Sequence, residues 1–276
     1  MRKISGEVRS VITGRREEEY NEILGKCRTP ELVYHLSDLR ANVIRWIEIA
    51  KDARVLELGS ECGAISSYLW KKAGELVCLE ESSEMSVLNR IRNKEADNMT
   101  CLCGETEELL EELTPESFDM IFMIGLDLEV KEELMPKLAS LLKKQGRLVF
   151  AADNKYGLQF FAGNQDEDGR GYFPFTAEEG EDSFRLLSKK RIEKLMKLAG
   201  LDDLRFYYPF PDYRYTNVLY SDQYLPRQNE LKRSWRNVSE QRMVLFDEES
   251  AFRNICQDGL FPLFSNSFLV IGEKNE

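Results

Sequence analysis

Apolar and polar positions alternate along residues 54–152 in a way that predicts regular secondary structure. Short apolar runs are separated by stretches in which apolar residues recur every three or four positions. The runs predict β-strands, and the three-to-four spacing predicts helices that bury one face. This alternation predicts a parallel sheet with helices on both faces. The expected strands are 54–58, 76–80, 99–103, 118–124 and 147–152, and the expected helices are 64–73, 83–92, 106–112 and 132–143.

The flanking regions extend this core. Residues 1–50 look helical, because Pro30 follows a capping Thr29 and an apolar stripe with helical spacing comes after it. A helix is expected to start at Ser188 and end at Gly200, with a strand over 204–208 next. A short helix over 248–257 precedes a closing strand over 267–272, which we expect to be the antiparallel member of a seven-stranded sheet. We therefore expect residues 51–276 to form one domain, with insertions at about 153–187 and 209–265.

The first strand runs into a glycine-containing turn, which is where a doubly wound sheet binds its ligand. Gly59 allows a sharp turn there, and Gly63 allows the next helix to pack close to the strand. A dinucleotide-binding turn carries a further glycine that lets the backbone approach a pyrophosphate, but this chain has Glu61 at that position. Two like charges a few ångströms apart cost roughly 1 to 4 kcal/mol. The turn therefore favours the cationic S-adenosylmethionine (SAM) over NAD, with an NAD-dependent sugar-modifying enzyme as the alternative.

A second acidic signal lies at the end of the next strand. Glu80 follows Gly59 by 21 residues, the spacing at which a carboxylate accepts hydrogen bonds from ribose hydroxyls. The neighbouring Glu81, and Glu57 and Glu61 around the first turn, are compatible with a cofactor that carries a sulfonium and an ammonium. The two signals together indicate an adenosine-bearing cofactor.

The chain resembles the class I SAM-dependent methyltransferases. The likeness to the class runs from about Arg54 to Asn154. Four phrases resemble more narrowly a bacterial group that accompanies glycosyltransferases of surface-glycan assembly, at residues 56–65, 154–158, 160–163 and 208–213. The resemblance implies a Rossmann-like sheet, SAM as cofactor and S-adenosylhomocysteine (SAH) as product. It also implies that the N-terminal helical segment, residues 1–50, covers the cofactor pocket as a lid.

The resemblance extends the set of expected cofactor contacts. In this class, the turn after the third strand lies near the adenine, and the end of the fourth strand meets the methionine part. The expected cofactor-binding residues are Glu57, Gly59, Ser60, Glu61, Gly63, Glu80, Glu81, Gly104, Glu105, Thr106, Ile124 and Gly125.

The acceptor side is expected to come from the two insertions. Asp153 leaves the fifth strand toward the crevice and is the first candidate general base, followed by His35 and Asp127. Asp153 could equally cap the next turn, and His35 could be an ordinary helix residue. Arg40, in the lid segment, could form a surface ion pair or face the site. The expected substrate-binding residues are Asn154, Tyr156, Tyr208 and Tyr213, the two last within an aromatic-rich loop that could present flat faces to a sugar or pack the insertion onto the domain.

Composition narrows the choice of partners and compartment. A net charge of −11 disfavours nucleic acid and anionic membrane surfaces, and no apolar run is long enough to cross a membrane. The start lacks a signal peptide's apolar core, so a cytoplasmic location is expected. The six cysteines are scattered, and with a single histidine they are interpreted as reduced, mostly buried thiols rather than metal ligands.

The sequence thus predicts a SAM-dependent methyltransferase, with O-methylation of a sugar or glycan intermediate as the preferred reaction. The alternatives are a catalytically silent SAM- or SAH-binding partner of glycosyltransferases and a methyltransferase for a non-sugar small molecule. A glycosyltransferase is the expected protein partner, and the oligomeric state stays open.

Overall fold

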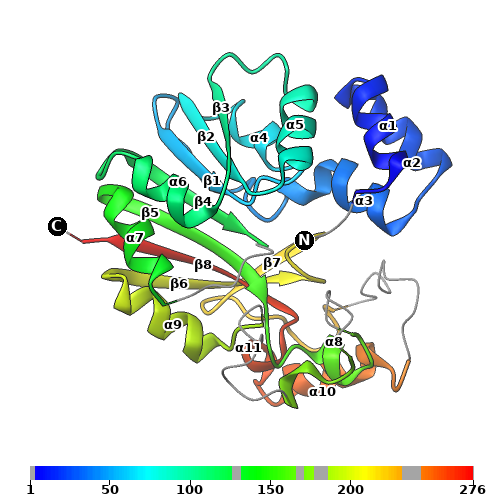
Figure 1. The fold of residues 1–276 in the computed structure, drawn as a ribbon. Coiled ribbons are helices and arrows are strands. Elements are labelled where there is room, and N and C mark those ends of the chain that lie inside the picture. The colour runs from blue at the N-terminus through cyan, green and yellow to red at the C-terminus, as the bar shows by residue number, and fades with distance from the viewer. Residues whose placement is uncertain (1–3, 126–131, 166–170, 177–185, 232–243, 276) are drawn as a thin grey trace.

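A computed structural model describes residues 4–125, 132–165, 171–176, 186–231 and 244–275. Its centre is a single mixed sheet (Figure 1). The strands are β1 (Arg54–Leu58), β2 (Glu75–Glu80), β3 (Met99–Cys103), β4 (Phe118–Ile124), β5 (Leu142–Asp153), β6 (Leu201–Phe210), β7 (Val218–Ser221) and β8 (Ser267–Lys274). They lie in the order β3-β2-β1-β4-β5-β8-β6-β7. The first five are parallel to one another, and β8 runs antiparallel between β5 and β6.

This order confirms the doubly wound α/β fold and the antiparallel closing strand. The described residues contain one strand more than the seven expected, because β7 adds to β6 from within the 209–265 insertion. The helix expected over 64–73 is regular only in α4 (Ser66–Leu69). Beyond Leu69 the chain continues as a turn, in which the N–H groups of Lys72 and Ala73 both donate to the Leu69 carbonyl.

Helices cover both faces of the sheet. One face packs against α6 (Thr106–Glu112), α7 (Leu134–Leu141) and α9 (Lys189–Leu198), whose apolar side chains join those of the strands in one cluster. The other face packs against α4, the segment over 43–47 and α5 (Ser83–Arg92). Ser188 caps the start of α9, as the sequence predicts, by accepting from the Arg191 N–H.

The N-terminal residues form helices that lie beside α5 (Figure 1). They are α1 (Gly6–Gly14), η1 (Glu17–Glu19), α2 (Tyr20–Lys26), α3 (Pro30–Leu36) and η2 (Asp38–Ala41). Their apolar cluster includes Cys62 of the first turn and Met85 and Leu88 of α5. A buried Arg92 on α5 adds an ion pair with Glu17, at 2.9 Å between Nη2 and Oε1. These helices are therefore attached to the turn that follows β1.

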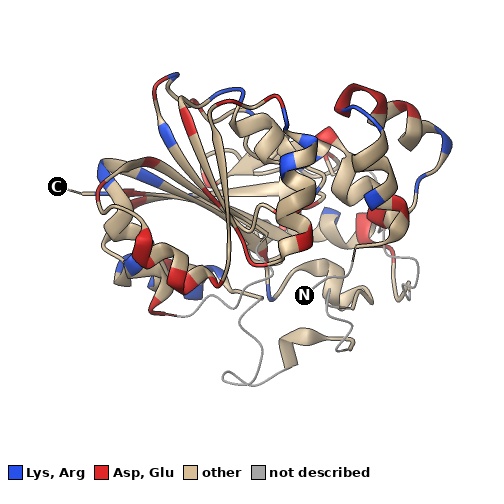
Figure 2. Cartoon of the chain, turned by 45° about the horizontal axis from the view of Figure 1, so that its top comes forward, with Lys and Arg blue, Asp and Glu red and all other residues tan. Residues whose placement is uncertain are grey.

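The two insertions supply the helices on the side of the sheet opposite the N-terminal helices (Figure 1). These are α8 (Leu158–Phe161), η3 (Pro174–Thr176), α10 (Glu248–Gln257) and α11 (Phe261–Phe264), with α8, α10 and α11 grouped together in Figure 1. Positive and negative residues are interspersed over the helices and loops in the view of Figure 2. Within the described ranges, none of the helices combines the length and the apolar character that crossing a membrane requires.

Candidate active site

The turn after β1 is fastened to the end of β2. The N–H groups of Gly59 and Ser60 donate to the Leu79 carbonyl at 2.9 and 3.2 Å. Gly59 has a φ of 67°, and Glu61 has a φ of 47°, which is rare for a residue with a side chain. The chain therefore holds Glu61 in a backbone conformation that turns its side chain toward the N-terminal helices.

Glu80 braces this turn from the end of β2. Its Oε2 accepts from the Glu61 N–H and its Oε1 accepts from the Ser82 N–H, both at 2.8 Å. Burial raises the pKa of the Glu80 carboxyl, and the two backbone donors oppose that shift only in part. Each carboxylate oxygen has a second lone pair, so a ribose hydroxyl can still donate to it. The expected ribose contact and the bracing of the turn are compatible.

Glu57 lies beneath the turn rather than at its rim. Its Oε2 accepts from the Ser66 hydroxyl at 2.6 Å and from the Cys78 thiol at 3.4 Å. Burial raises the pKa of Glu57 to about 7. This side chain contacts α4 and β2. It would therefore act on a cofactor through its electrostatic field and not through a direct contact.

A glycine at position 63 is required by Asn89 of α5 and by Asn93, the residue that follows α5. It has a φ of 78°, and a Cβ atom placed there would lie 2.2 Å from Asn89 Oδ1 and 2.6 Å from Asn93 Nδ2. The close contact of Gly63 is therefore with Asn89 and Asn93. The sequence analysis expected it to be with the preceding strand. Asn89 and Asn93 belong to a buried network with Ser66 and Ser67 that the sequence analysis did not identify. The sequence signal for this network was the pair of asparagines four residues apart, which lie on the same face of a helix among apolar residues.

The turn after β3 lies next to the end of β2. The Glu81 Oε1 accepts from the Thr106 N–H at 3.2 Å, and the Gly104 N–H donates to the Glu80 carbonyl at 3.2 Å. Thr106 is buried, whereas Glu105 is exposed. The structure thus brings the residues expected near the adenine next to those expected near the ribose.

The end of β4 is covered by an aromatic ring. Gly125 has a φ of 68°, and a Cβ atom there would lie 2.3 Å from Cε2 of Tyr213. Tyr213 is buried and belongs to the loop between β6 and β7, which Asn42 ties to the N-terminal segment by donating to the Thr216 carbonyl at 3.0 Å. Ile124 is also buried. Tyr213 is therefore the expected substrate-binding residue that the fold brings to the end of a parallel strand.

Arg40 lies between these two parts of the site. Only 2% of it is exposed, so the surface ion pair considered in the sequence analysis is wrong. Its Nη2 donates to the Tyr34 hydroxyl at 3.1 Å and lies 3.6 Å from Glu61 Oε2. Tyr34 in turn donates to Glu61 Oε1 at 3.0 Å. These three side chains connect the N-terminal segment to the turn after β1.

Asp153 ends β5 as expected, but its carboxylate is engaged. Arg214 donates to both of its oxygens, from Nη1 at 3.0 Å and from Nη2 at 2.6 Å, and both side chains are almost buried. Gln159 approaches the same carboxylate at 3.4 Å. The sequence analysis did not identify Arg214, which comes from the Tyr213 loop 61 residues further along the chain.

Three other expected residues are occupied elsewhere or lie apart. The Asn154 amide donates to the carbonyls of residues 263 and 265, and its oxygen accepts from the Tyr156 N–H, so its side chain organises a loop. Tyr156 itself is exposed. Tyr208 is buried in the cluster on the α9 face, where its hydroxyl donates to Asp222 and accepts from Lys189. The expectation that Tyr208 faces a substrate is not met, because its hydroxyl needs these partners inside an apolar environment.

Of the remaining candidate bases, His35 is buried on α3, with its ring edge against Tyr34 at 4.9 Å between centroids. Asp127 lies outside the described residues. In the part of the chain that the structure describes, His, Cys, Asp and Glu form no group of three suited to a metal ion. The six cysteines are all free thiols, and only Cys62 and Cys78 are buried.

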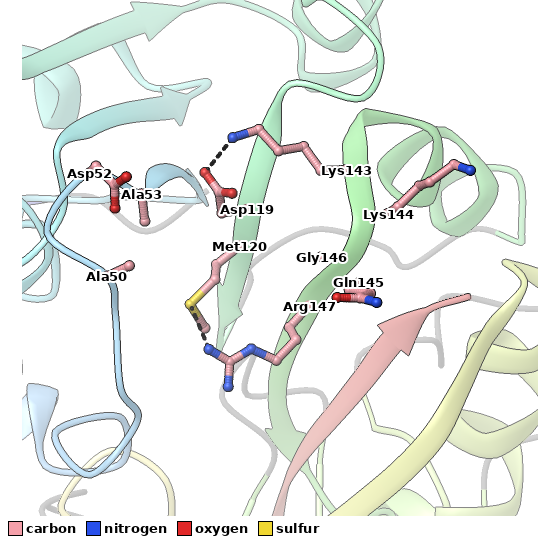
Figure 3. A pocket seen from close by; sticks show the side chains of 10 residues that line it. All are labelled: Ala50, Asp52, Ala53, Asp119, Met120, Lys143, Lys144, Gln145, Gly146 and Arg147. Carbon is pink, nitrogen blue, oxygen red and sulfur yellow. Dashed lines mark hydrogen bonds and ion pairs between the residues drawn. The ribbon is translucent and has the colours of Figure 1, made fainter. Parts of the chain in front are cut away.

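A cavity of about 210 Å³ lies away from this site (Figure 3). It opens at the amino ends of β1, β4 and β5, between Asp119, Lys143 and Arg147. Lys143 pairs with Asp119 there at 2.8 Å. Because ligands of doubly wound sheets bind at the carboxyl ends of the strands, this cavity is not the cofactor site.

The residues at the carboxyl ends fit a zwitterionic nucleoside. Carboxylates at Glu61 and Glu80 suit an ammonium and ribose hydroxyls, and Arg40 keeps unsatisfied donors beside them. A pyrophosphate would meet Glu61 directly. The charge pattern supports SAM.

Comparisons with known proteins agree. A family model for protein-L-isoaspartate(D-aspartate) O-methyltransferase (PCMT) matches residues 33–172, half of the chain. A SAM-dependent methyltransferase from Archaeoglobus fulgidus superposes with a TM-score of 0.54 at 16% identity, over 92% of this chain and 99% of that chain. Phosphoethanolamine N-methyltransferase 2 from Haemonchus contortus, solved with SAM, gives a TM-score of 0.54 at 15% identity, over 100% of this chain and 61% of that chain. A search of curated proteins returned no significant match.

The strand order, with the last strand antiparallel between β5 and β6, is that of class I methyltransferases. The two superpositions support the fold, and the family match supports the cofactor and the reaction. The preference for SAM over NAD is thereby confirmed. The chain belongs to the PCMT family and is a class I SAM-dependent methyltransferase.

Proposed function

We propose that this enzyme transfers the methyl group of SAM to a hydroxyl of a sugar or glycan intermediate. The observation that carries the proposal is Tyr213, whose ring lies against Gly125 at the end of β4 and under the Arg214 guanidinium, 4.2 Å from the ring centroid. The ring itself is buried and carries the guanidinium over its face, so we propose that it positions Arg214 and the polar groups beside it, which would bind the sugar hydroxyls. The resemblance of residues 154–158, 160–163 and 208–213 to methyltransferases of surface-glycan assembly points the same way.

The acceptor named in the family description is a different one, an isoaspartyl residue of a protein. The family match ends at residue 172, before the β6–β7 loop that contributes Tyr213 and Arg214. The matched residues therefore cover the cofactor half, and the part of the chain that we assign to the acceptor lies largely outside them.

When bound, SAM supplies a methyl group activated by the sulfonium. The protein aligns the acceptor oxygen with that group and excludes water, which accounts for most of the rate enhancement that such a displacement needs. We propose that residues 1–50 contribute to water exclusion as a lid, because Tyr34 and Arg40 reach Glu61 of the first turn.

The acceptor hydroxyl also has to lose its proton. Asp153 and His35 stay our candidate bases. The two-point contact with Arg214 stabilises the charged form of Asp153, which favours a positioning role in which Asp153 fixes Arg214 and its loop. Asp153→Asn tests this: if turnover stays near that of the wild type, Asp153 is no base, whereas a loss of several orders of magnitude with an unchanged fold would restore it.

The acceptor is tested with labelled SAM and a panel of nucleotide sugars, simple glycosides, an isoaspartyl peptide and a non-sugar phenol. Methyl transfer to a sugar, lost in Tyr213→Ala but retained in Tyr224→Ala, is the expected result. Tyr224 is exposed in the same aromatic-rich region and serves as the matched control. Transfer only to the peptide or only to the phenol would contradict the proposal.

The same assays test the alternative that the protein binds SAM or SAH without catalysing a reaction. Calorimetry with SAM and SAH followed by the transfer assay separates binding from turnover. Binding without turnover on any acceptor would favour a SAM- or SAH-binding partner of glycosyltransferases, and co-purification with a glycosyltransferase from a glycan-assembly system would then be the next measurement.

A further inference from the structure

An exposed apolar surface lies on the two insertions, around α8 and α11 (Figure 1). Five large apolar side chains there are between 36% and 50% exposed, namely Tyr172, Phe173, Leu245, Leu260 and Leu263. We call these five side chains the apolar face. Exposed apolar side chains that gather in one region indicate an interaction site, whereas single scattered ones do not.

Phe161 of α8 joins the segments that carry the apolar face. Its ring stacks on Phe175, with the ring centroids 4.2 Å apart, and meets the ring of Phe264 at 5.9 Å between centroids. The ring centroid of Phe175 in turn lies 6.0 Å from that of Phe173. The Leu245 N–H donates at 3.4 Å to the carbonyl of the residue that directly follows α8. Stretches of chain that are far apart in the sequence therefore meet at α8.

The segments that meet at α8 carry almost no charge. Residues 154–165, 171–176, 244–246 and 260–266 contain one charged residue, Lys155, although 32% of the residues in the chain are charged. A surface that binds a charged or strongly polar ligand needs charges or hydrogen-bonding side chains to replace the water that the ligand loses. The apolar face therefore suits an uncharged apolar ligand.

The apolar face begins beside the polar groups that we assign to the acceptor. On α8, Gln159 approaches the Asp153 carboxylate at 3.4 Å, and that carboxylate binds Arg214. Phe161 is two residues further along the same helix, a rise of about 3 Å. The amide side chain directly after β5 also donates to the carbonyl of Leu263 at 2.8 Å. A ligand that binds at Arg214 can therefore extend past α8 onto the apolar face.

We infer that the acceptor is a sugar that carries a hydrocarbon chain, and that the apolar face binds this chain. The inference rests on the sugar acceptor proposed above and adds a part of the substrate that groups suited to sugar hydroxyls do not recognise. A hydrocarbon chain needs no hydrogen-bond partner, so burial against aromatic rings and leucines is enough to hold it. A protein partner could also cover apolar side chains, but only a chain attached to the acceptor requires them to adjoin Arg214.

Calorimetry of the SAH-bound protein with methyl, butyl and octyl β-glucosides tests the inference, because these ligands differ only in the length of the chain. Octyl glucoside is kept below its critical micelle concentration. A fully buried methylene group gives about fourfold in affinity, so a chain covered on one side should gain about twofold per methylene. The octyl compound should bind about 10- to 100-fold more tightly than the methyl compound. Methyl transfer from labelled SAM to alkyl glycosides should follow the same order in kcat/KM.

The double variant Leu245→Gln/Leu263→Gln removes two exposed side chains of the apolar face. It should bind SAM and methyl glucoside as the wild type does, and its preference for the octyl compound should fall to about threefold or less. Leu198→Gln is the matched control, since Leu198 is about as exposed but ends α9, outside the segments that meet at α8. This control should keep the full preference for the octyl compound.

Equal or unmeasurable binding of the three glucosides, or an octyl preference that the double variant retains, would overturn the inference. A dimeric wild type and a monomeric double variant in sedimentation would assign the apolar face to a second copy of the chain instead. Binding of the wild type alone to phosphatidylcholine vesicles without glycolipid would assign the face to a membrane surface. If the dependence on chain length is kept but no sugar accepts a methyl group, the proposed sugar acceptor fails and the site for the chain stands.

Discussion

Gly63→Ala is the substitution whose cost can be worked most directly from the structure. The new methyl group would lie 2.2 Å from Asn89 Oδ1 and 2.6 Å from Asn93 Nδ2, so both side chains would have to move. Neither is free to do so without loss. Asn93 Nδ2 donates to Asn89 Oδ1 at 2.8 Å, and Asn89 Nδ2 donates to the Ser66 hydroxyl at 3.0 Å.

The expected loss of stability has two parts. Holding alanine at a φ of 78° costs about 1 kcal/mol. Breaking the two buried hydrogen bonds costs about 1 kcal/mol each. The free energy of unfolding should therefore fall by about 3 kcal/mol, measured by urea denaturation followed by circular dichroism.

Gly200→Ala separates the two parts. Gly200 has a φ of 72°, but a Cβ atom there would meet nothing within 4 Å, so it reports the backbone strain alone. Its expected cost is about 1 kcal/mol. If the two variants lose equal stability, the reasoning about the asparagine network is refuted. Gly63→Ala should in addition weaken SAM binding, whereas Gly200→Ala should not.

Three other predictions follow from the buried polar groups. Burial raises the pKa of Glu57 from 4.5 to about 7, so the folded protein holds this proton at pH values where the unfolded chain has lost it. The wild type therefore loses stability as the pH rises from 4.5 to 7, because the buried carboxyl must lose its proton. Glu57→Gln should be more stable than the wild type by about 3 kcal/mol at pH 8 and equally stable at pH 4. Parallel pH profiles of the two proteins in urea titrations would contradict this. Glu80→Ala should weaken SAM binding by about 1 to 3 kcal/mol in calorimetry, and an unchanged affinity would show that the ribose is held elsewhere. Tyr208→Phe should lower stability by about 1 kcal/mol through its lost contacts with Asp222 and Lys189, with the Kd of SAM and the KM of the acceptor unchanged, and a raised KM would return Tyr208 to the site.

The cofactor half could be predicted from the sequence because its signals are local. The turn over 55–66 and the 21-residue spacing from Gly59 to Glu80 lie within two neighbouring βα units. Capping residues such as Thr29 and Ser188 act within three positions of themselves, and the structure has both as expected. Short-range rules therefore sufficed for the succession of strands and helices along the chain and for the acidic residues at the ends of β1 and β2.

The acceptor half could not be predicted in the same way, because its contacts join distant parts of the chain. Asp153 meets Arg214, 61 residues away, and Tyr34 meets Glu61, 27 residues away. Tyr208 and Tyr213 are five residues apart in one aromatic-rich stretch, yet one is packed under the sheet and the other covers the end of β4. Which tyrosine lies at the end of β4 depends on the path of the chain after β6, and residue type gives no information about that path.

The position of β8 has a consequence for how this protein is handled. The strand β8 is an inner strand, paired with β5 over residues 267–273 and with β6 over residues 269–274 with one register shift. A truncation that removes these residues would split the sheet between β5 and β6 instead of trimming its border. During synthesis, β5 and β6 can be joined in one sheet only after the residues of β8 have left the ribosome.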